Sequence, residues 1–192
     1  FFDDTQAMAA AYETGEVDVA VSLPSTVMDL YEGRDDLLVT DQIATRYIYF
    51  NLNVEPFDDV RVREAFNLAI DREELCRIVG ADTEPTYNLV AKYMIDKNTG
   101  MRFVDEAEQP FEENAERARE LLAEAGYPNG EGFPKLTYNY PTLEMDSDTA
   151  QVIKEQLKEN LNIDIELKAQ ELQANYSGRH AGDFDLCRMN WT

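Results

Sequence analysis

The residue types best suited to binding chemistry stand in the run from Phe184 to Trp191, FDLCRMNW. The guanidinium of Arg188 offers five donors in a fixed fork, which suits a carboxylate held by two hydrogen bonds. The indole of Trp191 offers a flat apolar wall with one donor, which suits stacking against side chains or peptide planes. The residues alone leave two alternatives open: a salt bridge from Arg188 to a nearby acid, and core packing of Trp191.

The elements that must position these side chains alternate regularly in the last third of the chain. Apolar patterning predicts strands over 135–140, 163–167 and 184–191, with helices over 146–160 and 171–178 between them. Strands joined through helices form a parallel sheet with right-handed crossovers, and ligands bind beyond the carboxyl ends of such strands. The candidate ligand-binding residues after the first and last of these strands are Tyr140, Glu144, Arg188, Asn190 and Trp191.

Catalytic and metal chemistry find little support in the sequence. His180 is the only histidine, and because no second metal-type ligand stands at a useful spacing, we expect it in a solvated loop. Pairs of acids such as Asp58 and Asp59 stand in turns or at helix starts, where carboxylates serve as caps. Acid–base catalysis would need two carboxyl groups with pKa values pushed apart. With no G-x-S-x-G, Walker or H-E-x-x-H motif present, we predict no enzyme, no metal site and no cofactor.

The charge balance excludes some classes of partner. The chain has 39 acidic against 17 basic residues and a formal net charge of −22. Such a surface repels phosphate backbones and anionic lipids, so nucleic acid is excluded as a partner. A secreted protein, a halophile protein and a binder of cationic ligands all fit this acidity. No apolar run reaches the roughly 20 residues that span a bilayer, and Cys76 and Cys187 are expected to be buried thiols, with a disulfide left open.

The first half of the chain has its own order of predicted elements. A short helix over 1–16 and a strand over Val17–Val21 precede a short helix over 25–31. From Arg46 the residues alternate between two faces, with Ile48 and Phe50 on one of them, which predicts a strand.

Helical patterns and one long loop follow that strand. Asp59 is a plausible N-cap for a helix that follows, and a second helix is expected over Arg72–Val79. Residues 81–110 lack periodicity and predict a long loop. A helix over 114–125 then ends at Gly126, where glycines and prolines turn the chain into the next strand.

Three motifs together resemble one family. FN-x-x-x-x-PF-x-D-x-RVR-x-A-x-x-x-AIDR from Phe50, AGYPNG-x-GFP from Ala125 and FDLCRMNW from Phe184 resemble family 5 extracellular solute-binding proteins, the peptide- and nickel-binding receptors of ABC importers. In peptide-binding members the last motif lines the ligand cleft. The resemblance implies that Arg188 pairs with a peptide's carboxyl end and that Trp191 lines the pocket. Arg179 resembles an arginine in the turn before that strand and joins the candidates.

Other implications of the resemblance concern the ligand's charge. The acidic residue expected to hold the peptide's amino end should follow Thr192, so a piece of a longer receptor is expected. Glu144 stands where some peptide binders carry a basic residue, and if it faces the cleft it favours a cationic ligand group over a terminal carboxylate.

The resemblance also implies a fold and a function. The fold class is α/β, a type II periplasmic-binding-protein-like lobe with a mostly parallel sheet flanked by helices. Residues 1–43 are expected to be the tail of the first lobe with a crossing segment, and residues 44–192 the second ligand-binding lobe. The implied protein is the oligopeptide-capturing component of an ABC importer: extracytoplasmic, monomeric, partnered by permease subunits and bound to the membrane only through a lipid anchor outside this chain. A nickel chelate, haem or a sugar as cargo, and a sensory ligand-binding role, stay open.

Overall fold

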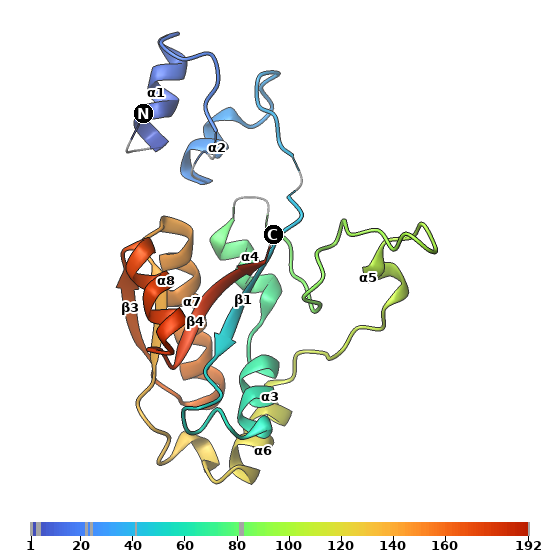
Figure 1. Ribbon diagram of the computed structural model, residues 1–192, viewed down its shortest axis with the longest axis vertical. Coiled ribbons are helices and arrows are strands. Elements are labelled where there is room, and N and C mark those ends of the chain that lie inside the picture. Colours follow the sequence, from blue (N-terminus) through green and yellow to red (C-terminus); the bar gives the residue numbers. More distant parts are fainter. Residues whose placement is uncertain are drawn as a thin grey trace. The chain divides into compact units, whose positions relative to one another are not determined.

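The chain divides into two compact units, Phe1–Asp41 with Gly80–Thr83, and Gln42–Val79 with Glu84–Thr192. The computed structural model describes residues 2, 5–21, 23, 25–40, 42–80 and 83–191. We refer to these parts as unit 1 and unit 2 and describe each by itself (Figure 1). The assignment of residues 1–43 and 44–192 to two lobes stays a prediction.

Unit 1 carries two short helices, α1 (Thr5–Glu13) and α2 (Ser25–Tyr31). The predicted strand over Val17–Val21 is wrong, because residues 17–21 have no strand conformation. Val19 and Val21 are 69% and 61% exposed. A strand needs a partner for its backbone groups, and within the described part of unit 1 no strand is present to provide one. Apolar alternation therefore gave a misleading signal here.

Unit 2 is built on a four-stranded sheet with the order β1-β4-β2-β3. The strands are β1 (Thr45–Phe50), β2 (Thr137–Pro141), β3 (Glu166–Gln170) and β4 (Leu186–Trp191). β2 pairs in parallel with both β3 and β4, as predicted for the last third of the chain. β1 lies antiparallel to β4 at one edge, with Thr45 opposite Trp191, so the sheet as a whole is mixed.

Helices flank this sheet (Figure 1). On one face of β4, Leu186 joins the main hydrophobic core, which contains residues of β2 and of α7. On the other face, Cys187 lies against Asn175 of α8. The helices of unit 2 are α3 (Val60–Leu68), α4 (Arg72–Val79), α5 (Phe103–Glu106), α6 (Ala115–Glu124), α7 (Glu144–Leu161) and α8 (Leu172–Ala181), with a 3₁₀ turn η1 (Pro128–Gly130).

Capping and side-chain hydrogen bonds fix the ends of several helices. Asp59 is the N-cap of α3, as predicted, and its carboxylate accepts a hydrogen bond from the backbone N–H of Arg61 at 2.8 Å. The buried amide of Gln156, on α7, accepts from the backbone N–H of Asp71 and donates to its carbonyl, at 3.0 and 3.2 Å. The turn between α3 and α4 is therefore held against α7.

The segment between α4 and α6 departs from the predicted long loop. It contains α5 and a backbone bridge between Ile95 and Arg102. The guanidinium of Arg72 lies over the rings of Tyr87 and Phe111, at 5.3 and 4.7 Å from their centroids, and holds both ends of the segment to α4. Its middle is apolar on the outside: large exposed side chains are Leu89, Met94, Ile95, Met101 and Phe103.

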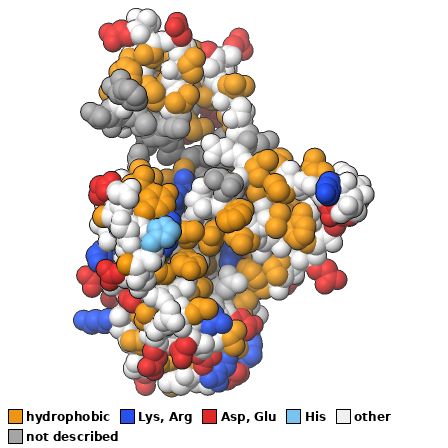
Figure 2. Space-filling view, in the orientation of Figure 1, with side chains coloured by type: hydrophobic (Ala, Val, Ile, Leu, Met, Phe, Trp, Pro, Cys, Tyr) orange, Lys and Arg blue, Asp and Glu red, His pale blue; other side chains and the backbone are white. Residues whose placement is uncertain are grey.

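The surface of unit 2 carries charges of both signs. Figure 2 shows acidic and basic side chains interspersed at the end that carries α3 and α6, and hydrophobic side chains gathered on the segment that leads to α5. The charged end fits a solvated exterior.

Candidate ligand-binding edge

The carboxyl ends of β2, β3 and β4 meet at one edge of the sheet of unit 2. The strands finish there at Pro141, Gln170 and Trp191. Since β1 runs the opposite way, it begins at this same edge, with Thr45 beside Trp191. We call this region the carboxyl edge, and it is where ligands bind in sheets of parallel strands.

Three charged side chains form a cluster at the carboxyl edge. Nη1 of Arg46, on β1, donates a hydrogen bond to Oδ1 of Asp146, on α7, at 2.9 Å. Nε of Arg188, on β4, lies 2.8 Å from the same oxygen, although its N–H is not aligned for a hydrogen bond. The strand register places Arg46 opposite Asn190 and Ile48 opposite Arg188, so both arginines project from the face that α7 covers.

Burial raises the free-energy cost of holding three charged side chains in this cluster. The side chain of Asp146 is 1% exposed, that of Arg188 14% and that of Arg46 42%. Oδ2 of Asp146 is buried, and no hydrogen-bond donor reaches it within the described part of the chain. The pKa of Arg46 is lowered, first by burial and then by the positive charge of Arg188, while Asp146 opposes this shift. Burial and the carboxylate of Asp146 raise the pKa of the Tyr138 phenol beneath.

Sequence reasoning named Arg188 as a candidate but missed the two residues that cluster with it. The sequence left a salt bridge from Arg188 to an acid open, and the structure identifies that acid as Asp146. Arg46 was treated only as the start of a strand. A signal was present: in the alternation of β1, Arg46 shares its face with Ile48 and Phe50, and a charge on a core-facing position requires a partner.

Trp191 and Arg188 project from opposite faces of β4, because they are three residues apart on a strand. Trp191 as a residue is 62% exposed, so core packing does not explain it. Asn190 is exposed as well and shares the face of Arg188. The carboxyl edge thus presents an apolar wall on one side of β4 and charged or polar groups on the other.

The remaining candidates are placed less favourably. Tyr140 is 8% exposed and packs in the core beside Tyr138. Arg179 lies in the last turn of α8 with its guanidinium 4.7 Å from the ring centroid of Tyr176. Glu144 begins α7 at the carboxyl edge, but its side chain lies outside the described part of the chain.

His180 and Cys76 differ from expectation in position, whereas Cys187 is buried as expected. His180 is exposed, as expected, but stands in the last turn of α8 instead of a loop, because α8 continues past Gly178 to Ala181. Within the described part of the chain, Cys76 and Cys187 form no disulfide bond; Cys187 is buried, while Cys76 is only partly so. Burial raises the pKa of the Cys187 thiol.

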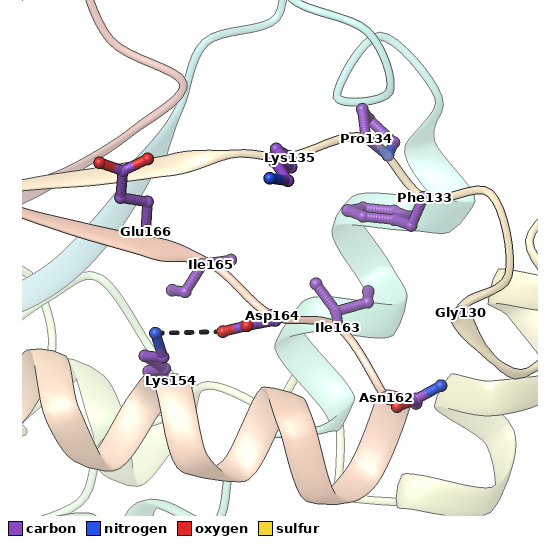
Figure 3. Close-up of a pocket in the computed structure, with 10 residues that line it drawn as sticks. All are labelled: Gly130, Phe133, Pro134, Lys135, Lys154, Asn162, Ile163, Asp164, Ile165 and Glu166. Atoms are coloured by element: carbon purple, nitrogen blue, oxygen red, sulfur yellow. Dashed lines mark ion pairs between the residues drawn. The ribbon is translucent and has the colours of Figure 1, made fainter.

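A pocket of about 390 Å³ lies at the opposite edge of the sheet, where β2 and β3 begin. Figure 3 shows Lys154 and Asp164 joined as an ion pair on one side of its lining, with Nζ and Oδ1 3.1 Å apart, and Phe133 away from this pair. The amino ends of parallel strands are not the usual ligand edge. This pocket is therefore distinct from the carboxyl edge.

The described residues form neither a metal centre nor a helix that could cross a membrane. No group of three or more histidine, cysteine, aspartate or glutamate side chains is arranged to hold a metal ion there. Within the same residues, every helix is too short or too polar to cross a membrane.

These features define the class of the protein. The α/β fold with a mixed sheet flanked by helices is that of type II periplasmic binding proteins. The family described as bacterial extracellular solute-binding proteins, family 5 middle, matches residues 1–192. The chain belongs to this family.

Individual relatives support the assignment. The dipeptide-binding protein DppE of Bacillus subtilis is 28% identical over 94% of this chain and 33% of its own length. The periplasmic oligopeptide-binding protein OppA of Escherichia coli is 30% identical over 94% of this chain and 33% of its own length. A crystal structure of an oligopeptide-binding protein, OppAIV of Borrelia burgdorferi, covers 99% of this chain and 37% of that chain with 30% identity and a TM-score of 0.84. The chain thus spans about a third of the length of such relatives.

Proposed function

We propose that this chain is part of the substrate-binding component of a peptide ABC importer, which captures extended oligopeptides between two lobes and delivers them to the permease. The relatives named above are binding proteins for dipeptides and oligopeptides. The OppA of Haemophilus influenzae, 28% identical with a TM-score of 0.79, was crystallised with the peptide RPPGFSPFR. The role we propose for the present protein is to capture a ligand and not to convert it chemically.

The observation that carries the proposal is the composition of the carboxyl edge. An extended peptide offers backbone amides, charged ends and varied side chains. Trp191, 62% exposed, supplies a flat apolar surface for a peptide plane or side chain. On the opposite face of the sheet, the 42% exposed side chain of Arg46 supplies charged donors, and the charge of the more buried Arg188 adds to them. Water-filled space between lobes would tolerate varied side chains and give broad specificity.

The partners and the location follow from the same family membership. Its members are extracellular solute-binding proteins, and the OppA proteins of Escherichia coli and Haemophilus influenzae are periplasmic. We place this protein outside the cytoplasm, as a monomer that docks on permease subunits, held at the membrane only through a lipid anchor beyond this chain. Two lobes that close on the ligand would present the closed form to the permease.

Titration calorimetry on the ligand-free full-length protein tests the proposal. Peptides of two to five residues should bind with one site per molecule. Non-peptide cargo is the rival: the probable deoxycholate-binding protein YgiS of Escherichia coli is 29% identical over 94% of this chain. Heat of binding for deoxycholate, a nickel chelate, haem or a sugar, with none for peptides, would replace the proposal by that alternative. A sensory role would show as peptide binding without peptide uptake by cells.

A further inference from the structure

The charged cluster at the carboxyl edge holds two guanidinium groups against one carboxylate. Nη1 of Arg46 and Nε of Arg188 lie 2.9 and 2.8 Å from Oδ1 of Asp146, so two positive charges share one carboxylate oxygen as their partner. Arg remains charged in proteins even where its pKa is lowered. Within the described residues, the cluster therefore carries one positive charge more than its own carboxylate neutralises. That local excess stands out in a chain with a formal net charge of −22.

The two arginines differ in their access to a ligand. The side chain of Arg188 is 14% exposed, and its Nε lies 2.8 Å from Oδ1 of Asp146. The side chain of Arg46 is 42% exposed, and one nitrogen, Nη1, is used in its hydrogen bond to Asp146. A guanidinium has five N–H donors. Arg46 thus keeps donors toward solvent, while Asp146 fixes the orientation of its guanidinium.

The charge balance also predicts which chemical group of a ligand Arg46 binds. An arriving anion would bring the cluster to two positive and two negative charges, and charge-assisted hydrogen bonds to a planar carboxylate fit the guanidinium fork. A cationic group of a ligand would instead meet the excess positive charge. Partial burial strengthens both effects relative to open water.

We infer that Arg46 is the ligand-contacting residue that receives a carboxylate of the bound ligand, and that Asp146 is the positioning residue that holds Arg46 and Arg188 side by side. Arg188 then serves as a buried support whose charge adds to the attraction. The inference rests on the proposed peptide-binding function and names a specificity contact within it. A peptide carries such a carboxylate either at its carboxyl end or on an acidic side chain.

Calorimetry on the ligand-free full-length protein separates these sources. The probes are tri- and tetrapeptides, each with a free or amidated carboxyl end and with Glu or Gln in place of one side chain. Arg46→Gln should weaken binding of the carboxylate-bearing peptides about tenfold or more and leave the corresponding neutral peptides within about threefold. If affinity falls only for peptides with a free carboxyl end, Arg46 binds the terminal carboxylate. If it falls only for peptides with Glu, Arg46 binds the acidic side chain.

Matched variants keep the outcome interpretable. Arg102, on the segment before α5, is 43% exposed and paired with Asp105, so Arg102→Gln removes a similar charge elsewhere and should leave every affinity unchanged. Arg46→Lys keeps the charge and should retain most of the preference for the carboxylate. If Arg46→Gln weakens charged and neutral peptides alike, or neither, the inference is overturned while peptide binding stands. If the wild-type protein binds none of the peptides, both the inference and the proposed function fail.

Discussion

The side chain of Asn51 joins the end of β1 to the backbone around Phe184. Its amide nitrogen donates to the carbonyl oxygens of Phe184 and Gly182, at 2.9 and 3.1 Å. Asn51 is 8% exposed, so water does not readily replace these bonds. An asparagine in the sequence motif after β1 therefore fixes the turn that leads into β4, the strand that carries Arg188 and Trp191.

Asn51→Ala should lower the free energy of unfolding by about 1 to 3 kcal/mol, because the carbonyl groups of Gly182 and Phe184 lose their donor and two part-buried hydrogen bonds are removed. Urea denaturation measures the change. The control is Asn98→Ala, an exposed site with no side-chain bond of comparable burial, which should change stability by less than about 0.5 kcal/mol. Equal effects of both substitutions would show that the Asn51 contacts do not stabilise the fold.

Gly130 tests the turn formed by the AGYPNG motif. Its φ is +75°, and an added Cβ would lie 2.6 Å from the carbonyl oxygen of Leu161. Gly126 has φ of +102° with open space around the same position. Gly126→Ala should cost about 1 to 2 kcal/mol from backbone strain alone. Gly130→Ala should cost at least about 1 kcal/mol more because the carbonyl must move, and thermal denaturation that ranked the two equally would contradict the steric account.

Asp59 gives a prediction with a defined pH dependence. Its carboxylate caps α3 and pairs with Arg61, and these contacts hold its pKa below the ordinary value. A lowered pKa in the folded state adds stability above the unfolded pKa of about 3.9, which is lost as the pH falls through the folded value. Asp59→Ala should cost about 1 kcal/mol at pH 7, and this cost should shrink in urea titrations below about pH 4. A cost that stayed constant down to pH 2 would show that the charge is unimportant.

Trp191→Ala should affect ligand binding more than stability. Trp191 as a residue is 62% exposed, so removal of its indole should change the free energy of unfolding by less than about 1 kcal/mol. Loss of a stacking wall should weaken peptide binding by about tenfold, and Trp191→Phe should restore most of it. An unchanged peptide affinity in calorimetry would remove Trp191 from the site.

Glu144→Gln tests the expectation that this acid disfavours a terminal carboxylate. If Glu144 faces the cleft, as that expectation requires, the substitution should strengthen binding of peptides with a free carboxyl end several-fold at low salt, and less at high salt. Amidated peptides should be unaffected. An identical response of free and amidated peptides would place the charge of Glu144 outside the reach of the ligand's end.

The sequence predicted those parts of unit 2 in which local pattern and tertiary packing agree. The strands β2 and β4 have buried apolar residues that join the core, and the helical connections among β2, β3 and β4 require parallel pairing. The start of β3 was misplaced: the buried Ile163 and Ile165 lie just before the strand, which begins at Glu166. The cap at Asp59 depends only on residues next to it in the chain. The failure at Val17–Val21 has the opposite cause, because a strand depends on a distant partner that local alternation does not reveal.

The cluster at the carboxyl edge lay beyond sequence reasoning for a related reason. Arg46 and Asp146 are 100 residues apart in sequence, and Asp146 stands near a helix start, where a solvated cap is the ordinary interpretation. Only the strand register brings Arg46 and Arg188 to the same face, and only the packing of α7 brings a carboxylate between them. An arginine on a core-facing position of β1 was the one local sign of it.

The most direct test is a crystal structure of the full-length protein with a bound tetrapeptide. The account predicts electron density for the peptide at the carboxyl edge, against the indole of Trp191, with one carboxylate oxygen within hydrogen-bond distance of Arg46. A peptide bound elsewhere, for example in the pocket lined by Lys135 and Lys154 at the opposite edge of the sheet, would contradict it.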